Sequence, residues 1–298
     1  MKKILITGAN GLLGQKLVTL LLEEGKTQLI ATARGDNRLP VKAGYSFESM
    51  DITNLENVND VINRHRPDVL IHTAAMTNVD QCESEKELCW AQNVTAVEYL
   101  VKACERNKTF LLHLSTDFIF DGNAGPYDEE GIANPISFYG WSKLAGEYLV
   151  KEAKTKWAIA RTVLVYGIAH DMSRSNIILW VKKSLEDGKT INVVSDQWRS
   201  PTLAEDLAKG CALIAEKDAE GIYNISGKDL LNPFQMAHLT ADYFGLDKSL
   251  IKEATAATFS QPAKRPAKTG FNIDKAVNDL GYNPVSFEEG IAILANQI

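Results

Sequence analysis

Cysteine is scarce in this sequence and shows no metal-binding spacing. The chain of 298 residues has four cysteines, and no two of them form a Cys-x-x-Cys pair. Structural zinc sites and disulfide-rich domains need closely spaced or more numerous cysteines. We therefore expect no metal site, and we predict the reduced, mostly buried thiols of a cytosolic protein. The four residues are Cys82, Cys89, Cys104 and Cys211.

Long apolar runs and an excess of basic residues are also missing. No stretch approaches the ~18 apolar residues of a membrane span, and the apolar run at the N-terminus is too short for a signal peptide. The formal net charge is −6 and the sequence pI about 5.5, whereas nucleic-acid-binding domains are usually basic. These absences predict a cytoplasmic protein that binds neither membranes nor nucleic acid.

The sequence does contain an alternation of strand-like and helix-like segments. Apolar residues make up 45% of the chain, enough for a sizeable core. Alternating strands and helices are typical of an α/β fold with a doubly wound parallel sheet and right-handed crossovers. We expect strands at Lys3–Ile6, Gln28–Thr32, Tyr45–Met50, Val69–Thr73, Phe110–Ser115 and Ala158–Tyr166, and helices at Leu12–Glu24, Leu55–Arg64, Ala91–Arg106 and Tyr139–Ala153.

The pattern loosens after Gly167. We predict a dinucleotide-binding Rossmann domain in residues 1–167, with parts of 190–227 completing its sheet, and a smaller, mainly substrate-binding lobe in residues 168–298. The Pro/Lys-rich stretch Gln261–Lys268 is interpreted as a loop over the site, with a linker as the alternative. Predicted elements are helices at Ile177–Glu186, Ala204–Glu216, Pro233–Phe244 and Ile273–Leu280, and strands at Thr190–Val194 and Ile222–Ile225.

Three glycines spaced three apart follow the first predicted strand. Gly8 permits a sharp turn, Gly11 removes the side chain that would block a pyrophosphate, and Gly14 lets the helix lie close to the strand. The unpaired N–H groups at the start of the helix then face the phosphates. A glycine-rich turn without a ligand is the alternative, but the strand before and the helix after favour dinucleotide binding. The candidate cofactor-binding residues in this turn are Gly8, Asn10, Gly11, Leu12 and Gly14.

The residues after the second strand bear on the form of the cofactor. An acidic residue there would bind a ribose 2′-hydroxyl and favour NAD. This chain has Arg34, with Arg38 nearby, and a guanidinium suits a 2′-phosphate. We therefore favour NADP(H), with NAD(H) as the alternative because Asp36 is either a displaced ribose ligand or a turn residue. Asp51-Ile52, after the third strand, are candidates for the adenine edge, or plain strand-end residues.

Tyr139 and Lys143 are four residues apart in a predicted helix and would lie on one face, one turn apart. A free phenol has a pKa near ~10, and a nearby ammonium would lower it. Tyr139 can then protonate a carbonyl oxygen while hydride reaches the carbon, and Lys143 can also bind the nicotinamide ribose. The alternative is a half-buried Tyr beside a solvated Lys, but the dinucleotide turn in the same chain favours catalysis.

A third catalytic group should come from the end of a neighbouring strand. Ser115 and Thr116 end one such strand, and their side chains face opposite ways, so only one should reach the substrate. Strand-end capping is the alternative role for both residues. His113 is interpreted as a packed strand residue without a catalytic role.

These motifs resemble the extended short-chain dehydrogenase/reductase superfamily over nearly the whole chain. More narrowly, the sequence resembles the dTDP-4-dehydrorhamnose reductase family. The resemblance implies that Thr116 is the catalytic hydroxyl, that Asp117 contacts substrate, and that Thr73-Ala74-Ala75 lie along the cofactor. The motifs that carry it are Thr7-Gly8-x-x-Gly11-x-x-Gly14, Thr73-Ala74-Ala75, Val79-Asp80-x-x-Glu83, Ser115-Thr116-Asp117-Phe118-Ile119-Phe120-Asp121-Gly122, Asn134-Pro135, Tyr139-Gly140-x-Ser142-Lys143-x-x-Gly146-Glu147, Arg161-Thr162-x-x-Val165-Tyr166, Asp196-Gln197 and Pro201-Thr202.

Two positions bear on the substrate. The family has a Trp that packs on the sugar where this chain has Leu164, which leaves the identity of the substrate open. Arg199 could face a nucleotide diphosphate or another anion, with an ordinary surface Arg as the alternative. Where the family has a metal it is peripheral, and we predict no metal ligands here.

The resemblance implies NADP(H)-dependent reduction of a nucleotide-activated 4-keto sugar, such as dTDP-4-dehydrorhamnose. Two alternative hypotheses are a nucleotide-sugar epimerase or dehydratase of the same superfamily, and a non-catalytic regulatory subunit similar to that of methionine adenosyltransferase. The expected partner is a nucleotide-sugar substrate, and a homodimer is an oligomeric state that the sequence allows.

Overall fold

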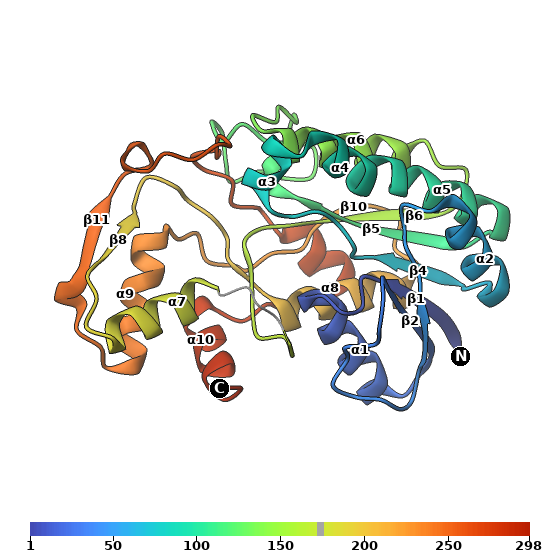
Figure 1. Ribbon diagram of the computed structural model, residues 1–298, viewed down its shortest axis with the longest axis horizontal. Coiled ribbons are helices and arrows are strands. Elements are labelled where there is room, and N and C mark those ends of the chain that lie inside the picture. Colours follow the sequence, from blue (N-terminus) through green and yellow to red (C-terminus); the bar gives the residue numbers. More distant parts are fainter. Residues whose placement is uncertain (172–175) are drawn as a thin grey trace.

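The computed structural model describes residues 1–171 and 176–298 and is built around a seven-stranded parallel sheet (Figure 1). The strand order is β10-β6-β5-β4-β1-β2-β3. The chain therefore adds strands toward one edge from β1 to β3 and toward the other edge from β4 onward, so the order reverses between β1 and β4. The predicted doubly wound sheet is confirmed, and ligands bind such sheets at the carboxyl ends of the strands near the reversal. The strands are β1 (Lys2–Thr7), β2 (Thr27–Ala33), β3 (Ser46–Ser49), β4 (Val69–His72), β5 (Phe110–Thr116), β6 (Trp157–Thr162) and β10 (Gly221–Asn224).

Helices cover both faces of this sheet (Figure 1). Side chains alternate along a strand, so in β1 Ile4 and Ile6 belong to one core and Leu5 to the other. The first core lies under α1 (Leu12–Glu24) and α8 (Ala204–Lys217). The second lies under three helices: α2 (Leu55–His65), α5 (Ala96–Asn107) and α6 (Phe138–Lys151).

Two predicted elements are interrupted. The strand expected at Ala158–Tyr166 ends at Thr162, because Leu164 has a left-handed φ of +37° that turns the chain. It resumes as β7 (Val165–Tyr166), which pairs with β9 (Thr202–Leu203) outside the main sheet. The helix expected at Ala91–Arg106 instead starts with a π-helical turn, η1 (Ala91–Thr95), before α5. Two short helices precede it, α3 (Val79–Ser84) and α4 (Lys86–Trp90).

A smaller lobe lies beside the main sheet, on the left of Figure 1. Its strands β8 (Ile191–Val194) and β11 (Ile251–Ala254) form a separate two-stranded parallel sheet. Within 190–227, β10 therefore joins the main sheet and β8 does not; the boundary at residue 167 stays a prediction. The lobe helices are α7 (Ile177–Glu186), α9 (Pro233–Phe244) and α10 (Phe287–Ala295), and short helical turns are η2 (Asp117–Ile119), η3 (Lys248–Leu250), η4 (Ala256–Thr258) and η5 (Ala276–Leu280).

Candidate active site

The glycine turn joins β1 to α1 by close backbone contacts. Gly8 has a φ of +70°, and a Cβ there would lie 2.8 Å from the backbone nitrogen of Ala74. A Cβ on Gly14 would lie 2.3 Å from the carbonyl oxygen of Gly8, so both positions require glycine. Gly11 is exposed and is the N-cap of α1, without a capping side chain, and Leu12 is the first helical residue. The first-turn N–H groups of α1 are thus suited to bind an anion.

The side chain of Asn10 holds the loop that follows β2. Asn10 is buried; its Nδ2 donates to the carbonyl oxygen of Asp36 at 2.9 Å, and its Oδ1 accepts from the backbone N–H of Arg38 at 2.9 Å. Arg34, Asp36 and Arg38 themselves are exposed. Asn10 therefore fixes the position of the loop that carries the candidate 2′-phosphate ligand, Arg34.

Asp51 lies half-buried beside that loop at the end of β3, and Ile52 follows it. Asp51 Oδ1 accepts hydrogen bonds from the backbone N–H of Thr53 at 2.9 Å and from its hydroxyl at 2.7 Å. The Thr53 hydroxyl, and to a smaller degree the charge of Arg34, lower the pKa of Asp51. The structure thus brings Arg34 and Asp51 together at one end of the site.

Thr73, Ala74 and Ala75 follow β4 and are held at both ends. The Thr73 hydroxyl donates to the carbonyl oxygen of Thr7 at 2.6 Å. At the other end, buried Asn93 in the π-helical turn η1 accepts from the Met76 N–H at 2.9 Å and donates to the Met76 carbonyl at 3.0 Å. Asn93 was not among the predicted site residues. Its only sequence signal is a polar residue on the buried face of a helix, and π-helical turns are frequent at functional sites.

Thr116 and Tyr139 lie together at the carboxyl end of β5. Tyr139 is the second residue of α6, 8% exposed, and a Cβ on the next residue, Gly140, would lie 2.2 Å from the carbonyl oxygen of Phe118. Close packing of α6 on η2 therefore sets the position of the phenol. Burial raises the pKa of Tyr139, and its hydrogen bond with the Thr116 hydroxyl partly offsets that rise.

Lys143 lies one turn further along α6 and is 3% exposed. Its Nζ donates to the carbonyl oxygen of Leu114 at 2.7 Å and lies 3.3 Å from Nε2 of His113. Burial lowers the pKa of Lys143 to about 8. The prediction that the pKa of Tyr139 lies below its ordinary value is wrong. Burial of the phenol raises this pKa by more than the favourable contacts lower it.

Asp117 and Arg199 form a buried pair under the Pro/Lys-rich stretch, residues 261–268, which we call the strap. Arg199 Nε lies 3.7 Å from Asp117 Oδ2, which also accepts a hydrogen bond from the Thr269 hydroxyl. Burial raises the pKa of Asp117, although the charge of Arg199 opposes the rise. The alternative of an ordinary surface Arg is wrong, because Arg199 is 5% exposed, and the anion that it faces in this structure is Asp117. Arg199 also donates to the carbonyl oxygens of Trp198, Pro266 and Ala267.

Leu164 is presented to solvent by a strained backbone. Its side chain is 43% exposed and its φ is +37°, a conformation that costs a non-glycine residue roughly 1–2 kcal/mol. The Leu164 carbonyl oxygen accepts from the Thr202 N–H at 3.2 Å, while the preceding Val163 is fully buried. Such strain persists only where the surrounding structure imposes it, often at functional sites.

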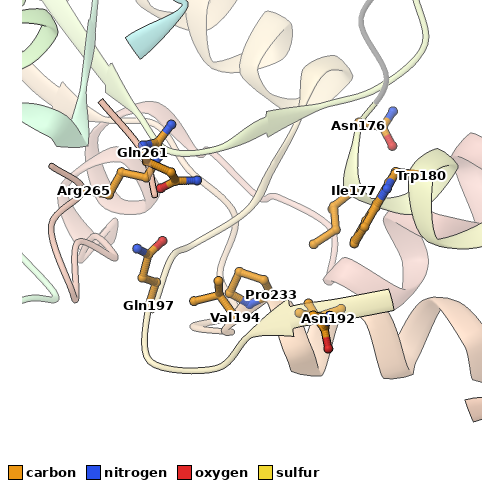
Figure 2. A pocket seen from close by; sticks show the side chains of 10 residues that line it. Asn176, Ile177, Trp180, Asn192, Val194, Gln197, Pro233, Gln261 and Arg265 are labelled. Carbon is orange, nitrogen blue, oxygen red and sulfur yellow. The ribbon is translucent and has the colours of Figure 1, made fainter. Parts of the chain in front are cut away.

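A cavity of about 480 Å³ lies in the smaller lobe, between α7, β8 and the strap (Figure 2). Arg265 and Gln261 of the strap line one side, and Ile177 and Trp180 of α7 line the other. Thr116, Tyr139 and Lys143 are not among its lining residues in the described part of the chain. The guanidinium of Arg265 also pairs with both carboxylate oxygens of Asp80 in α3, at 3.1 and 2.7 Å, so the cavity wall is tied to the main domain. No motif predicts this cavity, because its walls come from segments that are distant in the sequence.

Across residues 1–171 and 176–298, no group of three or more His, Cys, Asp or Glu residues is placed to hold a metal ion. All four cysteines are buried. In the same described ranges, no helix combines the length and apolar character needed to cross a membrane.

The parallel sheet, the glycine turn and the Tyr139/Lys143 helix together define an extended short-chain dehydrogenase/reductase, a class of NAD(P)-dependent oxidoreductases. A family model described as "RmlD substrate binding domain" matches residues 1–298. The chain therefore belongs to the dTDP-4-dehydrorhamnose reductase family, and the predicted family is confirmed.

Individual relatives agree with this assignment. The chain is 31% identical to a dTDP-4-dehydrorhamnose reductase from Aggregatibacter actinomycetemcomitans, over 98% of this chain and 97% of the relative. The structure of a dTDP-4-dehydrorhamnose reductase from Bacillus anthracis in complex with NADP superposes with a TM-score of 0.85 at 29% identity, over 100% of this chain and 99% of the other. The chain is also 31% identical to methionine adenosyltransferase 2 subunit beta from Xenopus tropicalis, over 85% of this chain and 75% of the relative. The expected cofactor, NADP(H) with NAD(H) as the alternative, is consistent with these findings.

Proposed function

We propose that this protein reduces the keto group of a nucleotide-activated 4-keto sugar with NADPH, and that dTDP-4-dehydrorhamnose is the first substrate to test. The observation that carries the proposal is the buried pair of hydroxyls, Thr116 and Tyr139, with the amine of Lys143 one helical turn away. Two hydroxyls at the carboxyl end of a parallel strand can bind one carbonyl oxygen and donate a proton to it.

The glycine turn and its surroundings fit the cofactor. Gly11 leaves the start of α1 open to a pyrophosphate, and the backbone nitrogen of Ala74 lies 2.8 Å from the Cβ position of Gly8 in the same turn. Arg34 would bind the 2′-phosphate and Asp51-Ile52 the adenine edge. A bound NADPH supplies the hydride that reduces the keto carbon.

The chain's own groups then handle the oxygen. Thr116 would orient the carbonyl, and Tyr139 would donate its phenolic proton to the oxygen as the carbon is reduced. The raised pKa of Tyr139 keeps the phenol protonated at neutral pH, so it is a competent acid before the reaction. Lys143 would bind the ribose hydroxyls and stabilise the phenolate that forms, because an ammonium favours a nearby anion.

The cavity in the smaller lobe would hold the nucleotide. The Trp180 side chain is 41% exposed and can stack on a base, and Nε of Arg265 can donate to a diphosphate while its two terminal nitrogens hold Asp80. Asp117 and Leu164 would contact the sugar between the cavity and Tyr139. Leu164 offers a sugar less contact area than a Trp would. The nucleotide 4-keto sugars that are tested should therefore differ in the shape of the sugar.

NADPH oxidation, measured against a panel of nucleotide 4-keto sugars and repeated with NADH, tests the proposal. We expect turnover with at least one sugar, and loss of turnover in Tyr139→Phe with NADPH affinity retained. Tyr148→Phe is the matched control, because Tyr148 lies on the same helix and is 57% exposed. Unchanged turnover in Tyr139→Phe would remove Tyr139 from the mechanism.

A regulatory subunit is the second candidate, favoured by the likeness to methionine adenosyltransferase 2 subunit beta. The intact set of Thr116, Tyr139 and Lys143 favours the enzyme instead. A stable complex with an unrelated enzyme, together with no turnover of any keto sugar, would support the regulatory function.

We also propose a cytoplasmic homodimer formed through the outer face of α4 and α6. Trp90, Trp141 and Tyr148 are 43–57% exposed on these two helices, which lie side by side (Figure 1). A groove beside Trp90 carries adjacent opposite charges, Lys86 and Glu87, so a two-fold contact can pair each charge with its opposite. Light scattering should show a dimer that Trp141→Glu converts to a monomer; a monomeric wild type would contradict this proposal.

A further inference from the structure

A row of polar side chains crosses the main sheet beneath the candidate site. Thr7, His72 and His113 are direct neighbours on β1, β4 and β5, and their side chains are buried. The Thr7 hydroxyl lies 2.7 Å from Nδ1 of His72, and the two imidazole rings stack with centroids 5.3 Å apart. Buried polar groups are costly unless they are paired, so a row of three in a core requires a reason.

The row ends at the amine of Lys143. Nε2 of His113 lies 3.3 Å from Nζ, and the carbonyl oxygen of Leu114 lies 2.7 Å from it. An ammonium has three N–H donors, so these two acceptors leave one donor for the site. On α6, a Cβ at Gly146 would lie 3.4 Å from Nε2, which shows that the helix packs directly on the imidazole.

The surroundings of His113 keep its imidazole neutral. Burial, and then the charges of Lys143 and His72, hold the pKa of His113 well below its ordinary value. A neutral ring that faces an ammonium must present an acceptor, which places the proton of His113 on Nδ1. Within the described residues Nδ1 has no hydrogen-bond partner, and a buried donor without a partner lowers the stability of the fold. In this tautomer the lone pair of Nε2 faces the amine of Lys143.

We propose that His113 is a positioning residue that fixes the ammonium of Lys143 so that its remaining N–H is directed at the nicotinamide ribose. This inference rests on the proposed binding role of Lys143, and it assigns a function to a residue that the sequence analysis interpreted as packing alone. A lysine side chain has several rotatable bonds, and two fixed acceptors restrict them before the cofactor binds.

The titratable groups that face Lys143 come from four elements. They are Glu147 on its own helix, Cys89 on α4, His72 on β4 and His113 on β5. Glu147 stabilises the ammonium from a distance, whereas His113 is the side chain within hydrogen-bonding range of it. Removal of the His113 acceptor should therefore make the ammonium easier to deprotonate.

The test is the pH dependence of NADPH binding, measured by fluorescence with His113→Leu, His113→Gln and His72→Leu. Gln keeps an acceptor near the Nε2 position, and Leu does not. His72→Leu is the matched control, because it removes the same ring from the same face of the sheet without touching the amine. We expect His113→Leu to bind NADPH about tenfold more weakly than the wild type. As the pH rises, this variant should lose NADPH binding at a lower pH than the wild type does. His113→Gln and His72→Leu should stay within about threefold of wild type.

Equal losses in His113→Leu and His72→Leu, or in His113→Leu and His113→Gln, would overturn the proposal. If His113→Leu does not fold, His113→Asn replaces it. The shorter Asn amide ends near the Nδ1 position and does not reach the amine of Lys143. Equal NADPH binding by the Asn and Gln variants would then overturn the proposal. The readout is cofactor binding, so a wild type that reduces no keto sugar contradicts the proposed function without affecting this test.

Discussion

Gly8 and Gly25 both have left-handed backbones, with φ angles of +70° and +64°, but their surroundings differ. A Cβ on Gly8 would meet Ala74, whereas a Cβ on Gly25, at the end of α1, would meet nothing within 4 Å. Gly25→Ala should therefore lower the free energy of unfolding by roughly 1–2 kcal/mol from backbone strain alone.

Gly8→Ala should show the same strain and, in addition, push Thr73–Ala75 out of place, so that NADPH affinity falls at least tenfold. Thermal unfolding and NADPH titration of both variants measure the two effects separately. NADPH affinity that is equal in the two variants would show that the contact of Gly8 with Ala74 does not shape the cofactor site.

Arg34 and Asp36 make opposite predictions about the cofactor. If the exposed guanidinium of Arg34 binds the 2′-phosphate through charge-assisted hydrogen bonds, Arg34→Ala should lose about 1.5–3 kcal/mol of NADPH binding, roughly 10- to 150-fold. NADH lacks that phosphate, so its affinity should change little. Asp36→Ala is the paired control: a selective loss of NADH binding in it would identify Asp36 as the ribose ligand and contradict the preference for NADPH.

At the scale of elements, the sequence predicted what depends on local patterns. Continuous apolar runs, which are typical of strands buried on both faces, located β1, β2, β4 and β5, and the glycine spacing located the turn into α1. The break at Leu164 could not be predicted, because nothing in a Leu side chain favours a positive φ.

The burial of Arg199 and the contact of Arg265 with Asp80 could not be predicted from the sequence either. Asp80 and Arg265 are separated by 185 residues, and such pairings follow from the tertiary fold. The same holds for the two sides of the lobe cavity, which lie on α7 and on the strap.

The pairing of Asp80 with Arg265 should hold the strap against α3. Asp80 also accepts from the backbone N–H of Ala263, at 3.2 Å, so one carboxylate fixes two points of the strap. In Asp80→Asn we expect faster amide hydrogen exchange in residues 261–268 and a several-fold higher KM for the nucleotide sugar, with kcat little changed. The pair is partly exposed, so a double-mutant cycle with Arg265→Gln should give a coupling of about 1 kcal/mol. Unchanged exchange in the strap would contradict the role of Asp80.

For the whole molecule, the two buried histidines should make stability depend on pH. Burial, with a smaller effect of Lys143, lowers the pKa of His72 to about 3, from 6.5 in the unfolded chain. The folded state therefore binds fewer protons than the unfolded state between these values. The stability contributed by neutral His72 is complete above pH 6.5 and is lost progressively as the pH falls toward 3. At pH 5 the loss from His72 is on the order of 2 kcal/mol, and His113 adds to it in the same direction.

Two buried carboxylates can be told apart from the histidines, Glu147 by the pH range in which it titrates and Asp117 by the sign of its effect. The pKa of Glu147 is lowered, because the hydrogen bonds and charge of Arg161 outweigh its burial, so its contribution is lost only at lower pH, below its ordinary range. Asp117 has a raised pKa and acts with the opposite sign, because its protonation stabilises the folded state as the pH falls. Urea unfolding at pH 7.5, 6.0 and 5.0 should therefore show a falling free energy that is flatter in the double variant His72→Gln/His113→Gln. A parallel decline in that variant and the wild type would assign the acid sensitivity to other groups and contradict the assignment of neutral, buried imidazoles.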